Sequence, residues 1–525
     1  MIRNIIFELN YFLKRLQTDF RNIYKPALIT IVVLGAFFRI VAFGTHDSLH
    51  IDEALYANWS ADIGCNYNIL CDMPGLDKPP IFHFLTGVFI FLLGPNDQAV
   101  KFVGLIMGIL MIPLAMLIAL NLGRKTSALW AGFFLALSPF EILYAPTGFA
   151  ETTCVFLCLA ALLTLIYRIP IVTGIFIGLA LATKQSVIFF LPLYGIFFYL
   201  RFTHYTRDLK KIALGFLVIV IPLLLWAAFI SDKGLGIFLA IYKKRFFTHA
   251  ENSMQIMEWL KFEKFFTGNW FTTIFSFVAI ALARIIYTVD ILRNRRKHVV
   301  LYFSGVFSIL LFVVGYDSLI SIMKYPLYSR YLLVISSSYL ILFGLSFDLV
   351  LKKLFLYQKR KFNIMTILVV LLIGYWIVKT HHEMNLFPDG ANYKISQAIK
   401  PCTEYIKKHS RKACVYYTDE TWPWVGWYFF VQRKKKLVIR TPANFTNPAG
   451  IQQVLDHVKK DYDELQDKTI YFIVNPVKDK NVFDLLEKNT GRKPRIKKEF
   501  VSQPADSKYN SYTVYSVDLK SLSAT

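Results

Sequence analysis

Long apolar runs fill the first three quarters of the chain and restrict its fold more than any other feature. Runs of about 18 or more residues recur up to about residue 380 and then stop, and such runs predict helices that cross a lipid bilayer. Only 18% of the residues are charged and 55% are hydrophobic, whereas soluble domains carry about 25% charged residues. The sequence therefore predicts a polytopic α-helical membrane protein.

The apolar runs predict about eleven transmembrane helices. The expected spans are 27–44, 99–121, 126–145, 150–167, 170–183, 187–200, 212–230, 270–289, 299–316, 331–350 and 363–380. Basic clusters follow the even-numbered spans, and Lys and Arg hold loops in the cytoplasm. These clusters are Arg124/Lys125, Arg168, Arg201 to Lys211, Arg293 to Lys297 and Lys352 to Lys361. The alternation predicts a cytoplasmic N-terminus and a tail on the other side.

One further apolar segment, residues 80–94, is only about 15 residues long, below the usual span length. If it crossed the bilayer, every later basic cluster would lie outside the cytoplasm. We therefore predict that it forms a juxtamembrane helix on the outer surface, within the first outer loop.

Three regions flank or interrupt the spans. In residues 1–26, apolar side chains recur at helical spacing among basic ones, which predicts an amphipathic helix on the inner membrane face. Residues 27–380 form the predicted membrane domain. Residues 381–525 alternate β-rich runs with helical patterns, which predicts an extracytoplasmic (periplasmic) α/β domain.

The net charge of +24 does not indicate a nucleic-acid partner. Much of this charge lies in short clusters between apolar runs, where it orients loops, and a basic patch alone is a weak signal for nucleic acid. Two cysteine pairs, Cys65/Cys71 and Cys402/Cys414, fall on the predicted outer side. They are either disulfides or free thiols, because spacing alone does not distinguish the two.

The first outer loop, 45–98, is rich in carboxylates and contains the string HIDEALYANW. Asp52 and Glu53 stand at the start of a predicted helix, where acidic residues cap the helix and interact with its dipole. The same carboxylates are also candidates for general acid–base chemistry.

Asp77 and Lys78 form the second notable string, LDKPPIF, in the same loop. The two prolines fix an extended entry to the juxtamembrane helix, so both side chains are held at its beginning. An adjacent acid and lysine are ordinarily solvated surface. At the level of a lipid head group, however, the lysine ammonium suits a phosphate.

Other outer segments supply further polar groups. Glu151, in the short loop 146–151, stands at the mouth of a span. It is either an acid stabilised by the dipole at the start of a helix or a catalytic group. His249, in loop 231–269, is either an ordinary loop histidine or a metal ligand together with a carboxylate of the first loop. Arg330 opens a span and is either a head-group anchor or a phosphate ligand.

The order of these motifs resembles one family. DEALYANW, DKPP and FLTGVFIFLLGPNDQAVKFVGLIMGIL are followed by GRKTSALWAGFFLALSPFEILYAPTGFAETT and GLALATKQSV. This series is similar to the C-type (GT-C) integral-membrane glycosyltransferases related to protein O-mannosyltransferases and to the lipid A aminoarabinose transferase. The likeness covers about residues 30–200, with weaker matches at RFFTHAE and SRYLL.

The resemblance implies roles for individual residues. Asp52 matches the catalytic acid of the first outer loop, and Glu151 matches a second-loop acid that is usually aspartate. Lys78 matches the lysine that binds the donor phosphate. Asp77 stands where the family has a metal-ligating glutamate, with His249 as the matching histidine. A divalent ion (Zn, Mg or Mn) is the implied cofactor.

These observations predict a glycosyltransferase (EC 2.4 class) that moves a sugar from a polyprenyl-phosphate donor to an extracytoplasmic lipid, glycan or protein. A single displacement at the anomeric carbon would invert its configuration. The alternatives are a transporter or lipid flippase and a non-catalytic assembly protein. A transporter would carry ionisable groups near mid-membrane. A bacterial inner membrane is the expected location; the sugar, the acceptor and the oligomeric state stay open.

Overall fold

The computed structural model divides the chain into two compact units, which we describe separately. Unit 1 comprises Met1–Thr45, Leu70–Leu85 and Lys101–Pro388, and unit 2 comprises His46–Ile69, Thr86–Val100 and Asp389–Thr525. The structure describes residues 2–45, 48–66, 79–230, 274, 276–286, 307–316, 329–357, 374–375, 390–409, 414–417, 422–429, 438–439, 452, 456, 469–475, 481–490, 493–502 and 512–518.

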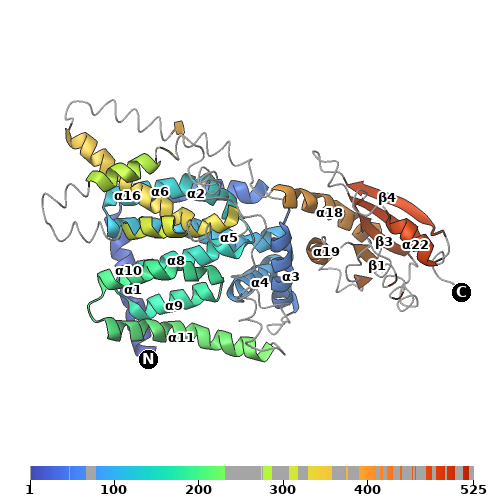
Figure 1. Cartoon of the computed structure of the whole chain (residues 1–525), viewed down its shortest axis with the longest axis horizontal. Helices are drawn as coiled ribbons and strands as arrows, with labels where there is room; N and C mark the ends of the chain where they lie inside the picture. The colour runs from blue at the N-terminus through green and yellow to red at the C-terminus, as the bar shows by residue number, and fades with distance from the viewer. Residues whose placement is uncertain are drawn as a thin grey trace. The chain divides into compact units, whose positions relative to one another are not determined.

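Unit 1 is helical (Figure 1). Two helices, α4 and α5, are divided between the two units. The helices of unit 1 are α1 (Ile2–Asn22), α2 (Lys25–Thr45), α4 (Ile81–Leu93), α5 (Asp97–Leu122), α6 (Lys125–Leu137), α7 (Pro139–Tyr144), α8 (Ala150–Ile166), α9 (Pro170–Leu181), η1 (Gln185–Phe190), α10 (Leu191–Arg201), α11 (Tyr205–Ile230), η2 (Ser329–Leu332) and α16 (Leu333–Tyr357). Among the described residues, three helical segments are long and apolar enough to cross a membrane: Lys25–Thr45, Asp97–Leu122 and Arg330–Lys352. Shorter apolar helices, α4 and α8 among them, lie between these three.

The predicted span 126–145 is interrupted. Ser138 takes an extended conformation, and Pro139 starts a new helix, α7, whose residue Glu141 donates its backbone N–H to the Ser138 hydroxyl. A broken helix leaves carbonyls without partners inside the membrane. The side chain of Arg39 on α2, which is fully buried, donates hydrogen bonds of 3.0 and 3.1 Å to the carbonyls of Leu135 and Ala136. The Arg39 guanidinium therefore supplies the hydrogen-bond donors for the carbonyls at the end of α6.

The acid next to this break has its own partners. Glu141 is buried, and its Oε1 accepts hydrogen bonds from the hydroxyls of Ser336 (2.5 Å) and Ser337 (2.7 Å) on α16. The negative charge of Glu141 also attracts Arg39. A polar network thus connects α2, α6, α7 and α16 and fixes the direction in which the chain leaves α6.

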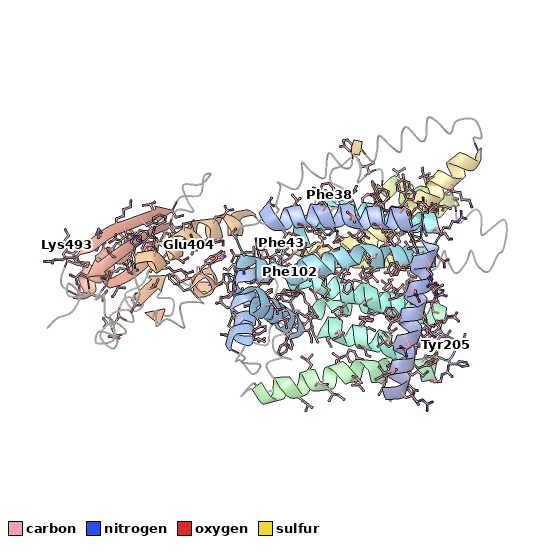
Figure 2. The ribbon with its side chains drawn as sticks, turned by 180° about the vertical axis from the view of Figure 1, so that it is seen from behind. Phe38, Phe43, Phe102, Tyr205, Glu404 and Lys493 are labelled. Atoms are coloured by element: carbon pink, nitrogen blue, oxygen red, sulfur yellow. The ribbon has the colours of Figure 1, made fainter. Side chains whose placement is uncertain are left out.

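The outer layers of unit 1 pack through aromatic and glycine contacts. Phe43 of α2 and Phe102 of α5 lie beside each other, with ring centroids 6.0 Å apart (Figure 2). Between α9 and α11, a Cβ added to Gly174 would lie 2.0 Å from the carbonyl oxygen of Ile212. One added to Gly215 would lie 2.0 Å from the carbonyl oxygen of Ile171. Small residues at a crossing let two membrane helices approach at backbone distance.

The predicted N-terminal helix is α1, which lies across the ends of neighbouring helices of unit 1 (Figure 1). Two buried acids anchor it. Glu8 accepts hydrogen bonds from the free N–H groups of Ile171 (2.8 Å) and Val172 (3.4 Å) at the start of α9. Asp19 accepts from Asn121 and from the Tyr167 hydroxyl, both at 2.7 Å.

Unit 2 contains a five-stranded mixed sheet and several helices. The strands are β1 (Cys414–Tyr417), β2 (Val438–Ile439), β3 (Thr469–Val474), β4 (Ile496–Ser502) and β5 (Tyr512–Asp518), and the helices include α3 (Ile51–Asn66), α18 (Gly390–His409), α19 (Trp422–Tyr428) and α22 (Val482–Thr490). The strand order is β2-β1-β3-β5-β4. The β1–β2 and β1–β3 pairs are parallel, and β5 pairs antiparallel with β3 and β4.

Helices cover both faces of this sheet, because successive strand residues point to opposite sides. Phe472 of β3 and Tyr515 of β5 contact Phe483 of α22, at 6.1 and 4.8 Å between ring centroids. Their neighbours Ile473 and Val514 join the core formed with α18 and α19. On that second face Cys402 is a buried thiol, and it donates to the carbonyls of Ala398 and Tyr512.

Helix α3, which lies in the predicted first outer loop, packs within unit 2 against α19. Asn58 of α3 donates a 2.8 Å hydrogen bond to the Pro423 carbonyl, and the Trp424 indole N–H donates one of 2.7 Å to the Leu49 carbonyl. Ala54 and Ala57 are fully buried in the same core. The contacts thus group His46–Ile69 and Thr86–Val100 with Asp389–Thr525.

The α9–α11 crossing yields a stability prediction. Gly174→Ala places a methyl group against backbone atoms that cannot rotate away, so we expect the variant to lose at least about 1–3 kcal/mol of stability. Thermal unfolding in detergent, followed by tryptophan fluorescence, measures the change. Gly195→Ala on α10 is the matched control, because nothing lies within 4 Å of its added Cβ. Equal melting temperatures for the two variants would contradict the close packing.

Candidate functional site

Glu151 stands in the first turn of α8 and is 2% exposed. The preceding turn is held by the Tyr144 carbonyl, which accepts hydrogen bonds from the hydroxyls of Thr147 (2.7 Å) and Thr152 (3.4 Å). The N-cap, Phe149, makes no side-chain cap. A carboxylate at this end of α8 lies near the positive end of the helix dipole.

Two cations from distant parts of the chain meet this carboxylate. Lys184 follows α9, and its ammonium forms an ion pair with Oε1 of Glu151. Arg330 comes from η2, and its Nε lies 3.6 Å from the same oxygen. All three side chains are buried, at 10% exposure or less. Folding therefore assembles a charged cluster that spans about 180 residues of sequence.

Aromatic rings surround the two cations. The Arg330 guanidinium lies 4.8 Å from the ring centroid of Phe149 and 5.6 Å from that of Tyr331. The Lys184 ammonium lies 5.5 Å from the Tyr331 centroid. Such contacts stabilise a cation where water is scarce. The rings therefore help to keep both positive charges at one buried position.

This Glu151–Lys184–Arg330 cluster has the chemistry of an anion site. A guanidinium can bind two oxygens of one phosphate, and a lysine adds a mobile point charge. The Glu151 carboxylate contacts both cations through one oxygen. Burial strengthens all of these electrostatic interactions relative to water.

The start of α3 shows how the acidic pair of the first outer loop is used. Glu53 is fully buried, and its Oε2 accepts a 2.7 Å hydrogen bond from the backbone N–H of His50. The His50 ring in turn accepts from the backbone N–H of Asp52, at 3.2 Å. This is a reciprocal capping arrangement. Glu53 thus caps the start of α3, and the backbone N–H of Asp52 takes part in the same arrangement.

Asp77, Lys78 and His249 lie outside the described residues. Within the part of the chain that the structure describes, no group of three or more His, Cys, Asp or Glu side chains lies close enough to hold a metal ion. Of the predicted residues, the structure therefore brings Glu151 and Arg330 together.

Lys184 is a member of the cluster that the sequence analysis did not single out. The signal was present, because a lysine within the apolar stretch GLALATKQSVIFF is an expensive residue that usually has a partner. Its partner, Glu151, lies 33 residues earlier in the chain, and no local sequence pattern connects the two residues.

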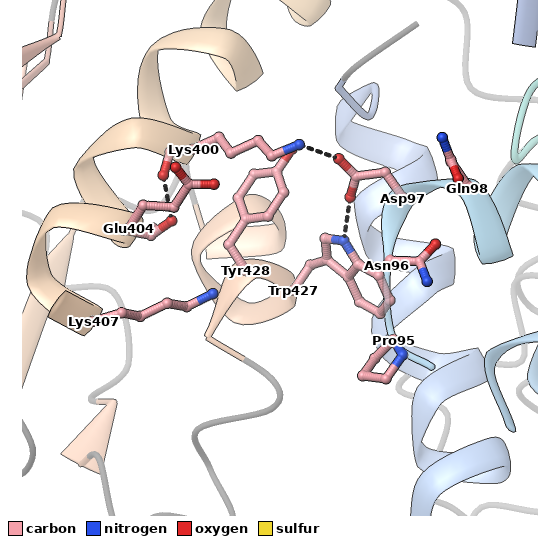
Figure 3. Close-up of a pocket in the computed structure, with 10 residues that line it drawn as sticks. Pro95, Asn96, Asp97, Gln98, Lys400, Glu404, Lys407, Trp427 and Tyr428 are labelled. Carbon is pink, nitrogen blue, oxygen red and sulfur yellow. Dashed lines mark hydrogen bonds and ion pairs between the residues drawn. The ribbon is translucent and has the colours of Figure 1, made fainter. Parts of the chain in front are cut away.

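Unit 2 has a polar pocket of about 320 Å³ between the start of α5 and helices α18 and α19 (Figure 3). Asp97 accepts hydrogen bonds from the Lys400 ammonium (3.0 Å) and from the Trp427 indole N–H (2.8 Å). Burial and the charge of Asp97 raise the pKa of Tyr428 well above its ordinary value. The Lys400 ammonium and the Asp97 carboxylate form an ion pair inside this pocket, so the two charges neutralise each other.

Comparisons with known proteins agree with the resemblance seen in the sequence. Residues 77–230 match the family model described as dolichyl-phosphate-mannose-protein mannosyltransferase. This stretch includes Glu151 and Lys184. No curated protein sequence matches the chain.

The fold itself has solved relatives. ArnT from Cupriavidus metallidurans bound to undecaprenyl phosphate is 13% identical, with a TM-score of 0.63 over 96% of this chain and 100% of that one. The Archaeoglobus fulgidus oligosaccharyltransferase in complex with Zn and sulfate is 12% identical, with a TM-score of 0.51 over 88% of this chain and 69% of that one. The expected resemblance is therefore confirmed: this chain is a membrane protein with the fold of the C-type integral-membrane glycosyltransferases.

Proposed function

We propose that the protein transfers a sugar from a polyprenyl-phosphate donor to an extracytoplasmic lipid, glycan or protein. The observation that carries this proposal is the buried Glu151–Lys184–Arg330 cluster, two members of which lie in the stretch matched by the family model. ArnT, whose fold this chain shares, was solved with undecaprenyl phosphate, a lipid phosphate of the proposed class.

The donor phosphate is the leaving group of the proposed reaction. Arg330 and Lys184, with Lys78 from the first outer loop, supply positive charge to the phosphate as its bond to the sugar breaks. Preorganised charge of this kind is usually the largest single contribution to catalysis. Glu151 positions the two cations and exchanges its contacts with them for those of the donor.

Asp52 is the proposed general base. It takes the proton of the acceptor group as that group attacks the anomeric carbon, and the single displacement inverts the configuration there. A positioned base contributes about 10²–10⁴ in rate. The cap formed by His50 and Glu53 supports this role, because it fixes the first turn of α3, which carries Asp52.

A divalent metal is a further part of the proposal, with Asp77 and His249 as its ligands. When bound, the ion would neutralise charge on the donor phosphate. The Archaeoglobus fulgidus oligosaccharyltransferase was solved in complex with Zn.

The transporter and flippase alternatives receive less support. A transporter site is expected near mid-membrane, at broken helices. The break at Ser138 does occur within an apolar segment, but Arg39 and the α16 serines occupy its polar groups. Sugar transfer in vitro distinguishes the proposed enzyme from a transporter.

Asp52→Asn should abolish transfer because the amide cannot accept the acceptor proton. We expect a loss of about 10²–10⁴ in rate, measured with purified protein in proteoliposomes and a panel of labelled polyprenyl-phosphate sugars. Asp62→Asn, which removes a carboxylate from the same helix, should keep its activity. Unchanged turnover by Asp52→Asn would remove the base assignment.

Lys78→Ala should raise the dissociation constant of the donor lipid, because one positive charge on its phosphate is lost. A change of about tenfold is expected for a charge-assisted contact, and fluorescence titration with a non-transferable donor analogue measures it. Lys125→Ala, an exposed lysine at the start of α6, is the control. An unaltered constant would contradict the phosphate role of Lys78.

The Glu151–Lys184 pair should show strong thermodynamic coupling. Glu151→Gln and Lys184→Met each remove one partner of a buried ion pair. We expect each variant to lose about 3–5 kcal/mol of folding stability. The double variant should be more stable than the sum of the two losses predicts. Thermal unfolding of all four proteins gives the coupling energy. Strictly additive losses would show that the two charges do not depend on each other.

A further inference from the structure

A second charged pocket lies in unit 1, away from the Glu151 cluster. It has a volume of about 580 Å³ and is lined by α1, by the turn between α8 and α9, and by the turn between α10 and α11. Its lining is rich in cationic side chains: Arg168, Arg201, Arg207 and Lys211. Neither the proposed reaction nor its donor site uses any of them.

The acids of this pocket are already engaged. Glu8 accepts hydrogen bonds from the first N–H groups of α9. Asp208 accepts from its neighbour Arg207, at 3.4 Å. Within the described residues, no hydrogen bond or ion pair links the side chain of Arg168 or Arg201 to a carboxylate, and the charges of the two arginines repel each other. Two neighbouring guanidiniums without an acid between them suit an anion with several oxygens.

The backbone of Arg168 adds an independent observation. Its N–H donates to the Leu165 carbonyl, and the next N–H donates to the Thr164 carbonyl, both at 3.0 Å. These bonds form a Schellman cap at the end of α8, in which the residue after the cap is usually glycine. Arg168 has a φ of 60°, which is unfavourable for a residue with a Cβ. The chain thus has an arginine where its backbone favours glycine.

The surroundings favour a lipid over a soluble anion. Phe7 and Tyr11 of α1 line the pocket, and they are 72% and 48% exposed. Helix α1 lies across the ends of neighbouring helices (Figure 1), which is the arrangement expected of an amphipathic helix in the membrane interface. Basic pockets between membrane helices at this depth suit phospholipid head groups.

We propose that this pocket binds the phosphate of an anionic membrane lipid, through Arg168 and Arg201, with Phe7 and Tyr11 beside its acyl chains. The pocket of unit 2 is a useful contrast, because there Asp97 neutralises Lys400. The proposal does not depend on the sugar-transfer activity, since the residues of the two sites are different.

Full-length protein in a neutral detergent tests the proposal. Short-chain phosphatidylglycerol, short-chain phosphatidylcholine and inorganic phosphate are titrated separately, and the rise in melting temperature gives an apparent affinity for each. We expect phosphatidylglycerol to stabilise the protein most. Arg201→Gln and Arg168→Gly should each weaken its apparent affinity at least about tenfold. Arg168→Gly also relieves the backbone, so its melting temperature without lipid should be maintained or raised.

Lys210→Gln is the matched control. It removes one positive charge from the start of α11, near the pocket, but Lys210 is exposed and does not line the pocket. Affinity losses as large as those of Arg201→Gln would overturn the proposal, because they would indicate a general attraction of positive charge. Equal stabilisation by phosphatidylcholine would overturn the phosphate selectivity. Saturation by inorganic phosphate, with no gain from acyl chains, would overturn the assignment to a lipid.

Discussion

The satisfaction of backbone polar groups within the apolar layer is the constraint on which unit 1 depends. The chain breaks at Ser138 and Pro139, and the freed carbonyls at the end of α6 are met by the guanidinium of Arg39. Without that side chain, the exposed carbonyls would have no water to bind at this depth. The break redirects the chain through α7 to the start of α8, so the position of Glu151 follows from how the preceding helix is terminated.

The need of buried polar groups for partners also explains the Glu151 cluster. Three ionised side chains are costly to bury singly, but they are tolerable together when aromatic rings and mutual contacts surround them. The members of the cluster come from three segments distant in sequence, so the fold itself fixes their geometry.

Sequence periodicity predicted the apolar helices well, since α2, α5, α8 and α16 start and end within a few residues of the expected spans, except that α16 extends to Tyr357. The break at Ser138 was missed because the residues on both sides are apolar, and only one proline interrupts the pattern. Glu151 and Arg330 were found as separate candidates. Their joint contact with Lys184 depends on packing between helices, which no local pattern encodes. Glu53 caps the start of α3, as its position predicted, and its catalytic role stays a prediction.

The packing of α3 against α19 restricts where the protein can be truncated. Leu49, Ala54 and Ala57 have no exposed surface because Trp424 and its neighbours cover them. A shortened chain that lacked the residues after 388 would present this apolar stripe to water and leave the Trp424 contact unmade. The part of unit 2 after residue 388 is then better regarded as part of the scaffold that holds α3 and Asp52 than as an accessory module, and attempts to minimise the protein should retain it.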